Sequence, residues 1–416
     1  MGASNPPTTV KVSFLLFFSA VGALATQGCG TVTDGPVSPG DDGGNSAGGT
    51  EAEHPGARTS GAGGGGVTGG AAGAETGDSG KGGSESIGGL APGAPSGGFS
   101  AIAAGYQSTY AIRDFAAYRL DPNGPQPIEG LASGVTAIAA ATEQACAIVN
   151  GSAVCWGSFI GNWYNEEDHS APAQVEGLTS DVTAISTNVA YNGLDNACAV
   201  MGGGVMCWGW SYGAAINSDQ WPLVQVEGLT SGATAIATAG YHSCAVVDGG
   251  AECWGANDSG QLGDGTTTGS SVPVPVRGLT SGVTAVGVGD YRSCAIVDGG
   301  VWCWGGAANL LDDGTATNSS VPVQVQGLTS GVTALAVGSS HACAVVDGGA
   351  RCWGANYAGQ LGNGTTTTGV VPVPVQGLTT GVTAIAAGYE HSCAIVSGGV
   401  WCWGNDDPTP AKVIGT

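Results

Sequence analysis

Twelve cysteines form six pairs, and the two members of every pair are nine positions apart. The pairs are Cys146 with Cys155, Cys198 with Cys207, Cys244 with Cys253, Cys294 with Cys303, Cys343 with Cys352, and Cys393 with Cys402. Such thiols can form disulfide bonds, bind a metal, or pack as small buried groups. The spacing does not match a zinc knuckle, so metal binding is the weakest of the three. The choice between the other two depends on the elements that position each pair.

A turn dipeptide lies between the cysteines of each pair, such as Asp248-Gly249 in CAVVDGGAEC. Asp-Gly is a preferred pair for a two-residue hairpin turn of type I′. A turn at this point places Cys244 opposite Cys253 at a non-hydrogen-bonded pair, where side chains approach most closely. The corresponding dipeptides are Asn150-Gly151, Gly202-Gly203, Asp298-Gly299, Asp347-Gly348 and Ser397-Gly398. We therefore predict six cross-strand disulfides, with free buried thiols as the alternative.

The thirteenth cysteine, Cys29, follows an apolar run, SFLLFFSAVGALA, with Lys11 as the only charge before it. The run is too short for a transmembrane helix and is typical of a signal peptide. Its end resembles a bacterial lipoprotein signal, in which the cysteine is lipidated, although Thr26 stands where that family prefers an apolar residue. We predict a signal peptide over residues 1–29 and an outer-membrane lipoprotein or cell-surface protein that contacts the membrane only through its lipid. Ordinary secretion is the alternative.

Composition divides the rest of the chain into two parts. Residues 30–97 are mostly Gly, Ala, Ser, Thr and Pro and lack apolar periodicity, which predicts a disordered tether. Residues 98–416 hold the cysteine pairs and form the predicted folded domain. The net charge of −23 argues against nucleic acid as a partner, because binding to phosphates needs Lys and Arg.

The folded part repeats with a period near 50 residues, since the first cysteines of the pairs fall 46 to 52 residues apart. Such a period is typical of a solenoid or a propeller. The runs between turns are short and β-branched, with no helical periodicity, so the fold class is all-β. A segment resembling VTAIA occurs seven times, and so does a strand that begins at proline. We therefore expect seven units, the first without a disulfide because Thr109 and Tyr118 take the cysteine positions.

The chain begins with the VTAIA type of strand and ends with the proline type. We expect the N-terminal and C-terminal strands to pair and close the ring, which removes exposed sheet edges.

Two further registers recur in the units. A tryptophan followed by glycine comes after each second cysteine, and we expect it to pack between adjacent sheets. These residues are Trp156, Trp208, Trp254, Trp304, Trp353 and Trp403. Polar residues recur two positions before the first cysteine, and we expect them to make structural hydrogen bonds rather than a ligand site. They are Gln107, Gln144, Asn196, His242, Arg292, His341 and His391.

The pattern GYxHSCAxVxGGxxCWGxNxxGQLGxGT, followed by PVxVxGL and VTAIAAG, resembles the regulator of chromosome condensation repeat over residues 98–416. The resemblance implies a seven-bladed β-propeller. The founding member is a nucleotide exchange factor and nucleosome binder, but the predicted export, the acidity and the lack of an inserted β-wedge argue against exchange activity. The cysteines and the signal are similar to secreted bacterial members. A secreted bacterial protein of this fold inhibits β-lactamases through its propeller face.

No nucleophile with a matched base, metal motif or nucleotide-binding loop stands out, so we expect no catalysis, no cofactor and no metal. The segments 157–172 and 209–222 depart from the repeat and are rich in aromatic residues beside acidic ones. Their candidate partner-binding residues are Phe159, Trp163, Tyr164, Trp210, Tyr212 and Trp221. We predict a monomeric, non-enzymatic binding scaffold for another protein. The alternatives are a glycan-binding envelope module and a passive structural surface protein, with the aromatics packed locally.

Overall fold

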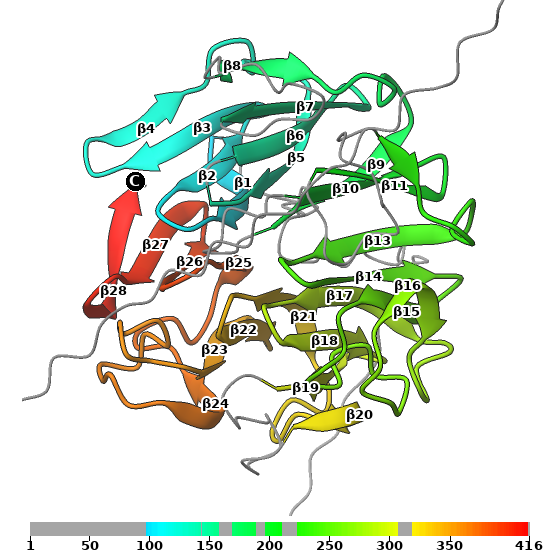
Figure 1. Cartoon of the computed structure of the whole chain (residues 1–416). Coiled ribbons are helices and arrows are strands. Elements are labelled where there is room, and N and C mark those ends of the chain that lie inside the picture. Colours follow the sequence, from blue (N-terminus) through cyan, green and yellow to red (C-terminus); the bar gives the residue numbers. More distant parts are fainter. Residues whose placement is uncertain are drawn as a thin grey trace, which may run out of the picture. The chain divides into compact units, whose positions relative to one another are not determined.

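Short β-branched runs separated by glycine and aspartate turns form seven four-stranded antiparallel sheets in the computed structural model. The structure describes residues 97–142, 144–157, 169–188, 196–209, 223–306 and 318–414. The sheets are arranged as blades around one axis (Figure 1). The predicted class, an all-β seven-bladed propeller, is confirmed. Within the described ranges, no helix is long and apolar enough to cross a membrane. The predicted signal peptide, Cys29 and nearly all of the tether lie outside these ranges.

Each blade is built from four strands that follow one another in the chain. Blade 1 holds β1 (Phe99–Ala104), β2 (Thr109–Arg113), β3 (Ala116–Asp121) and β4 (Gly124–Pro127); blade 2 holds β5 (Val135–Ala140), β6 (Gln144–Val149), β7 (Ser152–Gly157) and β8 (His169–Gln174); blade 3 holds β9 (Val182–Thr187), β10 (Asn196–Met201), β11 (Gly204–Gly209) and β12 (Val224–Gln225). Blade 4 holds β13 (Ala233–Thr238), β14 (His242–Val247), β15 (Gly250–Gly255) and β16 (Ser270–Pro275); blade 5 holds β17 (Val283–Val288), β18 (Arg292–Val297), β19 (Gly300–Gly305) and β20 (Ser319–Gln324). Blade 6 holds β21 (Val332–Val337), β22 (His341–Val346), β23 (Gly349–Gly354) and β24 (Gly369–Pro374); blade 7 holds β25 (Val382–Ala387), β26 (His391–Val396), β27 (Gly399–Gly404) and β28 (Asp407–Ile414).

The hairpin between the second and third strands has the predicted register in blades 2 to 7. In blade 4, Val247 is opposite Gly250 and Cys244 is opposite Cys253. Asp248 in the turn has a φ of 49°, the left-handed conformation that a type I′ turn requires. The turn chemistry therefore decides which thiols meet.

All six predicted disulfides are present, one in each of blades 2 to 7, with Cα–Cα separations of 4.0 to 4.1 Å. In blade order they join Cys146 to Cys155, Cys198 to Cys207, Cys244 to Cys253, Cys294 to Cys303, Cys343 to Cys352, and Cys393 to Cys402. The alternative of free buried thiols is therefore wrong for these twelve cysteines.

Blade 1 corrects one prediction. Its cysteine positions are taken by Tyr110 and Arg119, which are opposite each other, and not by Thr109 and Tyr118. Tyr110 pairs with Ala103, as Cys393 pairs with Ala386 in blade 7. The predicted absence of a disulfide from this blade holds, but the residues responsible lie one position further along.

The ring closes between blades 1 and 7, but not by the predicted pairing of terminal strands. β1 pairs with β2 and β28 pairs with β27, so both terminal strands stay in their own blades. The propeller begins with the first strand of blade 1 and ends with the fourth strand of blade 7, and each of the seven sheets has four strands. Closure is made by packing and hydrogen bonds, such as the bond from the Phe99 amide to the Gly398 carbonyl at 3.0 Å.

The repeated tryptophans pack between blades, as predicted. Trp254 of blade 4 belongs to the same buried cluster as Val200 of blade 3 and Leu229 of the turn after it. Trp353 of blade 6 belongs to a cluster with Leu328, which follows blade 5. Each blade thus completes the core of the blade before it, which holds the first strands in a rigid ring around the axis.

Candidate interaction site at the channel mouth

In all seven blades the first strand ends and the second strand begins at one end of the propeller axis, which we call the channel mouth. The polar residues two positions before each first cysteine form what we call the polar register. The residue that follows the first strand donates its amide to the carbonyl of the polar-register residue, as Gly289 does to Arg292 at 2.9 Å. The seven residues at this position are Gly105, Ala141, Asn188, Ala239, Gly289, Gly338 and Gly388. Because the same bond joins the ends of the first and second strands in every blade, the strand ends around the mouth are held in equivalent positions.

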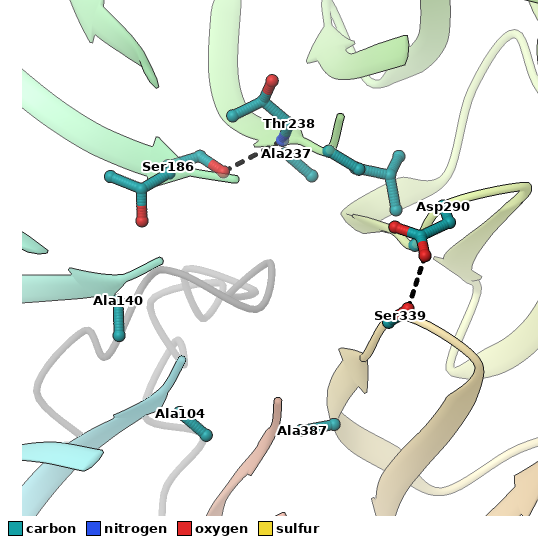
Figure 2. Close-up of a pocket in the computed structure, with 12 residues that line it drawn as sticks. Ala104, Ala140, Ser186, Ala237, Thr238, Asp290, Ser339 and Ala387 are labelled. Atoms are coloured by element: carbon teal, nitrogen blue, oxygen red, sulfur yellow. Dashed lines mark hydrogen bonds between the residues drawn. The ribbon is translucent and has the colours of Figure 1, made fainter. Parts of the chain in front are cut away.

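A hollow lies at this mouth, and its free space is about the size of one water molecule. Small residues at the ends of first strands, such as Ala104, Ala140 and Ala387, leave the space, as Figure 2 shows. Ser186 and Asp290 contribute polar groups to its wall. Residues from all seven blades thus reach one point that no single repeat could form.

Asp290 is the one acidic residue among those that line the hollow. Its Oδ2 accepts a hydrogen bond of 2.5 Å from Ser339 Oγ in the next blade (Figure 2). Its Oδ1 is buried and has no hydrogen-bond partner among the described residues. Burial raises the pKa of Asp290 to about 6, and the Ser339 bond offsets part of that shift. At neutral pH the mouth therefore carries an ionised carboxylate with one unsatisfied oxygen.

Five tyrosines, which we call the tyrosine arc, lie in connections at the same end of blades 1, 4, 5, 6 and 7. They are Tyr106, Tyr241, Tyr291, Tyr357 and Tyr389. The rings of Tyr241 and Tyr291 stack at 5.4 Å, and those of Tyr106 and Tyr389 lie 4.8 Å apart. Tyr291 is 42% exposed and Tyr357 is 56% exposed. The arc therefore presents aromatic surface to solvent beside the hollow.

Acidic groups accompany the tyrosine arc. Partial burial, Tyr241 and the Asp290 carboxylate raise the pKa of Tyr291. Partial burial and the nearby Glu390 raise the pKa of Tyr357. The combination of exposed rings and carboxylates is the one that the sequence prediction placed in the irregular segments. Sequence reasoning missed it here because Tyr106, Tyr241 and Tyr389 belong to a recurring GY dipeptide. The connections that hold Tyr291 and Tyr357 likewise look like ordinary parts of the repeat.

The polar register makes structural hydrogen bonds between blades, as predicted. The Nε2 atoms of His242, His341 and His391 lie 2.7 to 3.0 Å from hydroxyl oxygens of the next blade. Burial lowers the pKa of His242 and His341 to about 3 and that of His391 to about 4. These histidines are neutral structural groups.

Blade 1 departs from the predicted register here as well. Ser108, not Gln107, takes the polar position, because the Gly105 amide donates to the Ser108 carbonyl at 2.8 Å. Thr109 then takes the place that Ser392 has in blade 7, where its hydroxyl lies beside a histidine of the preceding blade. The Thr109 Oγ1 atom lies 3.0 Å from His391 Nε2. The one-residue shift is the same as at the cysteine positions.

The regular GQLG loops also join neighbouring blades. The carbonyl of Gln261 in blade 4 accepts hydrogen bonds from Trp304 Nε1 at 2.9 Å and Ser293 Oγ at 2.8 Å in blade 5. Gly263 has a φ of 70°, and a Cβ there would lie 2.7 Å from the Trp304 ring. Gln360 makes the same bonds from blade 6 to blade 7. These loops are therefore structural.

The predicted partner-binding residues Phe159, Trp163, Tyr164, Trp210, Tyr212 and Trp221 lie outside the described residues, as does the predicted lipidation site Cys29. In the described part of the chain, no group of three or more His, Cys, Asp or Glu side chains could hold a metal ion.

Comparison with known proteins supports the fold assignment. Residues 248–296, 298–345 and 347–395 each match the regulator of chromosome condensation (RCC1) repeat, and residues 332–360 match a second model of that repeat. No curated protein sequence matches the chain. The chain therefore carries RCC1 repeats on a seven-bladed β-propeller.

Two solved structures share this fold. The crystal structure of human WBSCR16 is 20% identical, with a TM-score of 0.61, and the match covers 72% of this chain and 86% of that chain. The crystal structure of Kap60 bound to yeast RCC1 (Prp20) is 18% identical, with a TM-score of 0.56, and covers 70% of this chain and 78% of that chain. At these identities the likeness concerns the fold alone.

Proposed function

We propose that this chain is a non-enzymatic scaffold that binds a protein partner at the channel mouth. The observation that carries the proposal is the tyrosine arc, where Tyr291 and Tyr357 are about half exposed beside carboxylates. Tyrosine is enriched at protein interfaces because it offers apolar area and a hydroxyl on a side chain with few rotatable bonds. A propeller of RCC1 repeats is a fold commonly used as an interaction scaffold.

The aromatic residues of the irregular segments are proposed to extend this interface. Phe159, Trp163 and Tyr164 come between β7 and β8, and Trp210, Tyr212 and Trp221 come between β11 and β12. The corresponding connection in blade 4 begins at the channel mouth, where the Ala256 amide donates to the Tyr241 carbonyl at 2.9 Å.

We also propose that the protein works outside the cytoplasm. Six disulfides are compatible with an oxidising compartment, since cytosolic thiols are kept reduced. The signal-like apolar run and Cys29 support export with a lipid anchor. Mass spectrometry of the mature protein would show diacylglycerol on an N-terminal Cys29, and an unmodified N-terminus elsewhere would contradict the anchor.

The test is affinity capture from envelope extract with the oxidised full-length chain. We expect a protein to be retained by the wild type and lost from a Tyr291→Ala/Tyr357→Ala variant. The matched control is Phe115→Ala, because Phe115 is 50% exposed and lies in the hairpin turn at the opposite end of blade 1. A second arm, Trp163→Ala/Trp210→Ala/Trp221→Ala, tests the irregular segments separately.

Equal capture by the wild type and the tyrosine variant would contradict the proposed interface. Retention of polysaccharide alone would instead assign the face to glycan binding. The absence of any saturable binding would favour a passive structural protein.

A further inference from the structure

The hollow at the channel mouth contains a carboxylate that the described part of the protein leaves half satisfied. Ser339 Oγ donates a hydrogen bond to Oδ2 of Asp290, while Oδ1 is buried without a hydrogen-bond partner among the described residues. A buried acceptor without a donor costs free energy, and such atoms are rare in folded proteins. None of the residues that line the hollow is basic. A donor with positive charge from another molecule would satisfy both the geometry and the charge.

The other polar groups of the hollow are neutral hydroxyls. Ser186, Thr187, Thr238 and Ser339 line the wall with Asp290. Thr187 Oγ1 is buried and, like Asp290 Oδ1, has no hydrogen-bond partner among the described residues. The hollow thus offers one negative charge together with hydroxyl oxygens that can accept hydrogen bonds. A divalent cation would need more carboxylates than this wall supplies.

These hydrogen-bond acceptors discriminate between the two kinds of singly charged side chain, an ammonium and a guanidinium. A guanidinium binds a carboxylate best through both oxygens at once, but one oxygen of Asp290 is already bonded to Ser339. An ammonium has three donors on one nitrogen and needs only one carboxylate oxygen and neutral acceptors. The free space of the hollow is about that of one water molecule, which an ammonium group fills and a larger, planar guanidinium exceeds. Lysine therefore fits the hollow better than arginine.

The surroundings favour a lysine carried by a protein. Tyr291 follows Asp290 in the chain, is 42% exposed and stacks on Tyr241. Aromatic faces beside the mouth attract a cation and cover the alkyl stem. The chain as a whole has a net charge of −23, which steers a basic partner surface toward it.

We propose that the hollow at the channel mouth binds the ammonium group of a lysine side chain that the protein partner inserts, with Asp290 as the anion and Thr187 as a neutral acceptor. The inference rests on the proposed function, because the lysine is carried by the partner that contacts the tyrosine arc. It assigns the axis of the propeller a role in partner choice.

The test is calorimetric titration of the full-length oxidised chain with blocked pentapeptides that differ at one position, Ac-Gly-Ser-Lys-Ser-Gly-NH2 and its norleucine and arginine analogues. We expect the lysine peptide to bind at least tenfold more tightly than the norleucine peptide, and more tightly than the arginine peptide. Asp290→Asn should reduce lysine binding about tenfold or more. The matched control is Asp298→Asn, which makes the same charge change in the same blade, in the hairpin turn at its opposite end, where asparagine also suits the turn.

A second variant, Thr187→Val, removes the unsatisfied hydroxyl at nearly constant volume and should weaken lysine binding about threefold. Circular dichroism and a count of six disulfides show whether each variant is folded. Equal binding of the lysine and norleucine peptides, or an Asp290→Asn variant that binds like wild type, would overturn the inference.

The capture experiment separates the two proposals. A partner retained by Asp290→Asn but lost from Tyr291→Ala/Tyr357→Ala would overturn the lysine inference and leave the proposed interface in place. A partner retained by the tyrosine variant would overturn the proposed interface itself.

Discussion

The two halves of the ring are packed differently at the channel mouth. Four interfaces, from blade 5 through blades 6, 7 and 1 to blade 2, have glycine after the first strand, and we call them the glycine half. In the glycine half, a Cβ would lie 2.2 to 2.4 Å from a carbonyl oxygen of the next blade. The other three interfaces, which we call the side-chain half, have Ala141, Asn188 and Ala239 at this position.

The halves also differ in what joins the blades. In the glycine half, backbone bonds of 3.3 Å run from the Ser339 amide to the Gly388 carbonyl and from the Tyr389 amide to the Gly105 carbonyl. In the side-chain half, the Thr238 amide donates to a side chain, Ser186 Oγ, at 2.9 Å. On one side of the mouth, backbone packs tightly against backbone, whereas the other side has room for side chains. Residues of both halves line the hollow.

The largest expected effect is that of Gly388→Ala, which tests the tight packing directly. The new Cβ would lie 2.2 Å from the Gly105 carbonyl oxygen, so blades 7 and 1 must separate. We expect the free energy of unfolding to fall by about 3 kcal/mol. The control is Ala239→Gly in the side-chain half, which should cost about 1 kcal/mol or less. Equal losses in guanidinium unfolding of the oxidised variants would show that the two halves are packed alike.

The second effect is a pH dependence at the interfaces that use histidine. His391 is neutral in the fold, where burial lowers its pKa to about 4 from an ordinary value of 6.5. Above pH 6.5 neither state is protonated and the full stability is present. Below it the unfolded chain binds protons first, so stability is lost as the pH falls toward 4. At pH 5 the loss is about 2 kcal/mol for each such histidine.

The matched variant is His391→Gln, because Gln144 takes this position in the side-chain half. The variant should lose about 2 kcal/mol less than the wild type between pH 7 and pH 5, measured by denaturant unfolding. Asp290 acts in the opposite direction, since burial raises its pKa to about 6, but it is common to both proteins. An identical pH dependence in both would contradict a neutral buried histidine.

The third test concerns blade 1, the one blade of the glycine half without a disulfide. Tyr110→Cys/Arg119→Cys places thiols at the opposed positions and should form a seventh bridge. The bridge is worth about 2 to 3 kcal/mol in the chain-entropy model, and the lost contact of Tyr110 with Trp156 reduces the net gain to about 1 kcal/mol. Thr109→Cys/Tyr118→Cys should form none, because these residues are not paired. Thiol counting by mass spectrometry distinguishes the two, and the reverse result would restore the register expected from sequence.

The features that could be predicted are those set by neighbouring residues in the chain. The opposition of Cys244 and Cys253 follows from the Asp248-Gly249 turn, since a two-residue turn leaves one register. The predicted register of blade 1 was wrong by one position, because this blade lacks the cysteines that mark the register elsewhere. The tyrosine arc was overlooked because its members are far apart in sequence and each looks like part of the repeat.

By itself, the sequence determined the all-β class, the seven units and the six disulfides, because each depends on turn chemistry and alternation within one repeat. Only the tertiary structure decided how the ring closes and what lies at the channel mouth. Both depend on contacts between residues of different blades, such as Asp290 with Ser339 and His391 with Thr109. No local rule places such residues together, since their positions follow from how complete blades pack around the axis.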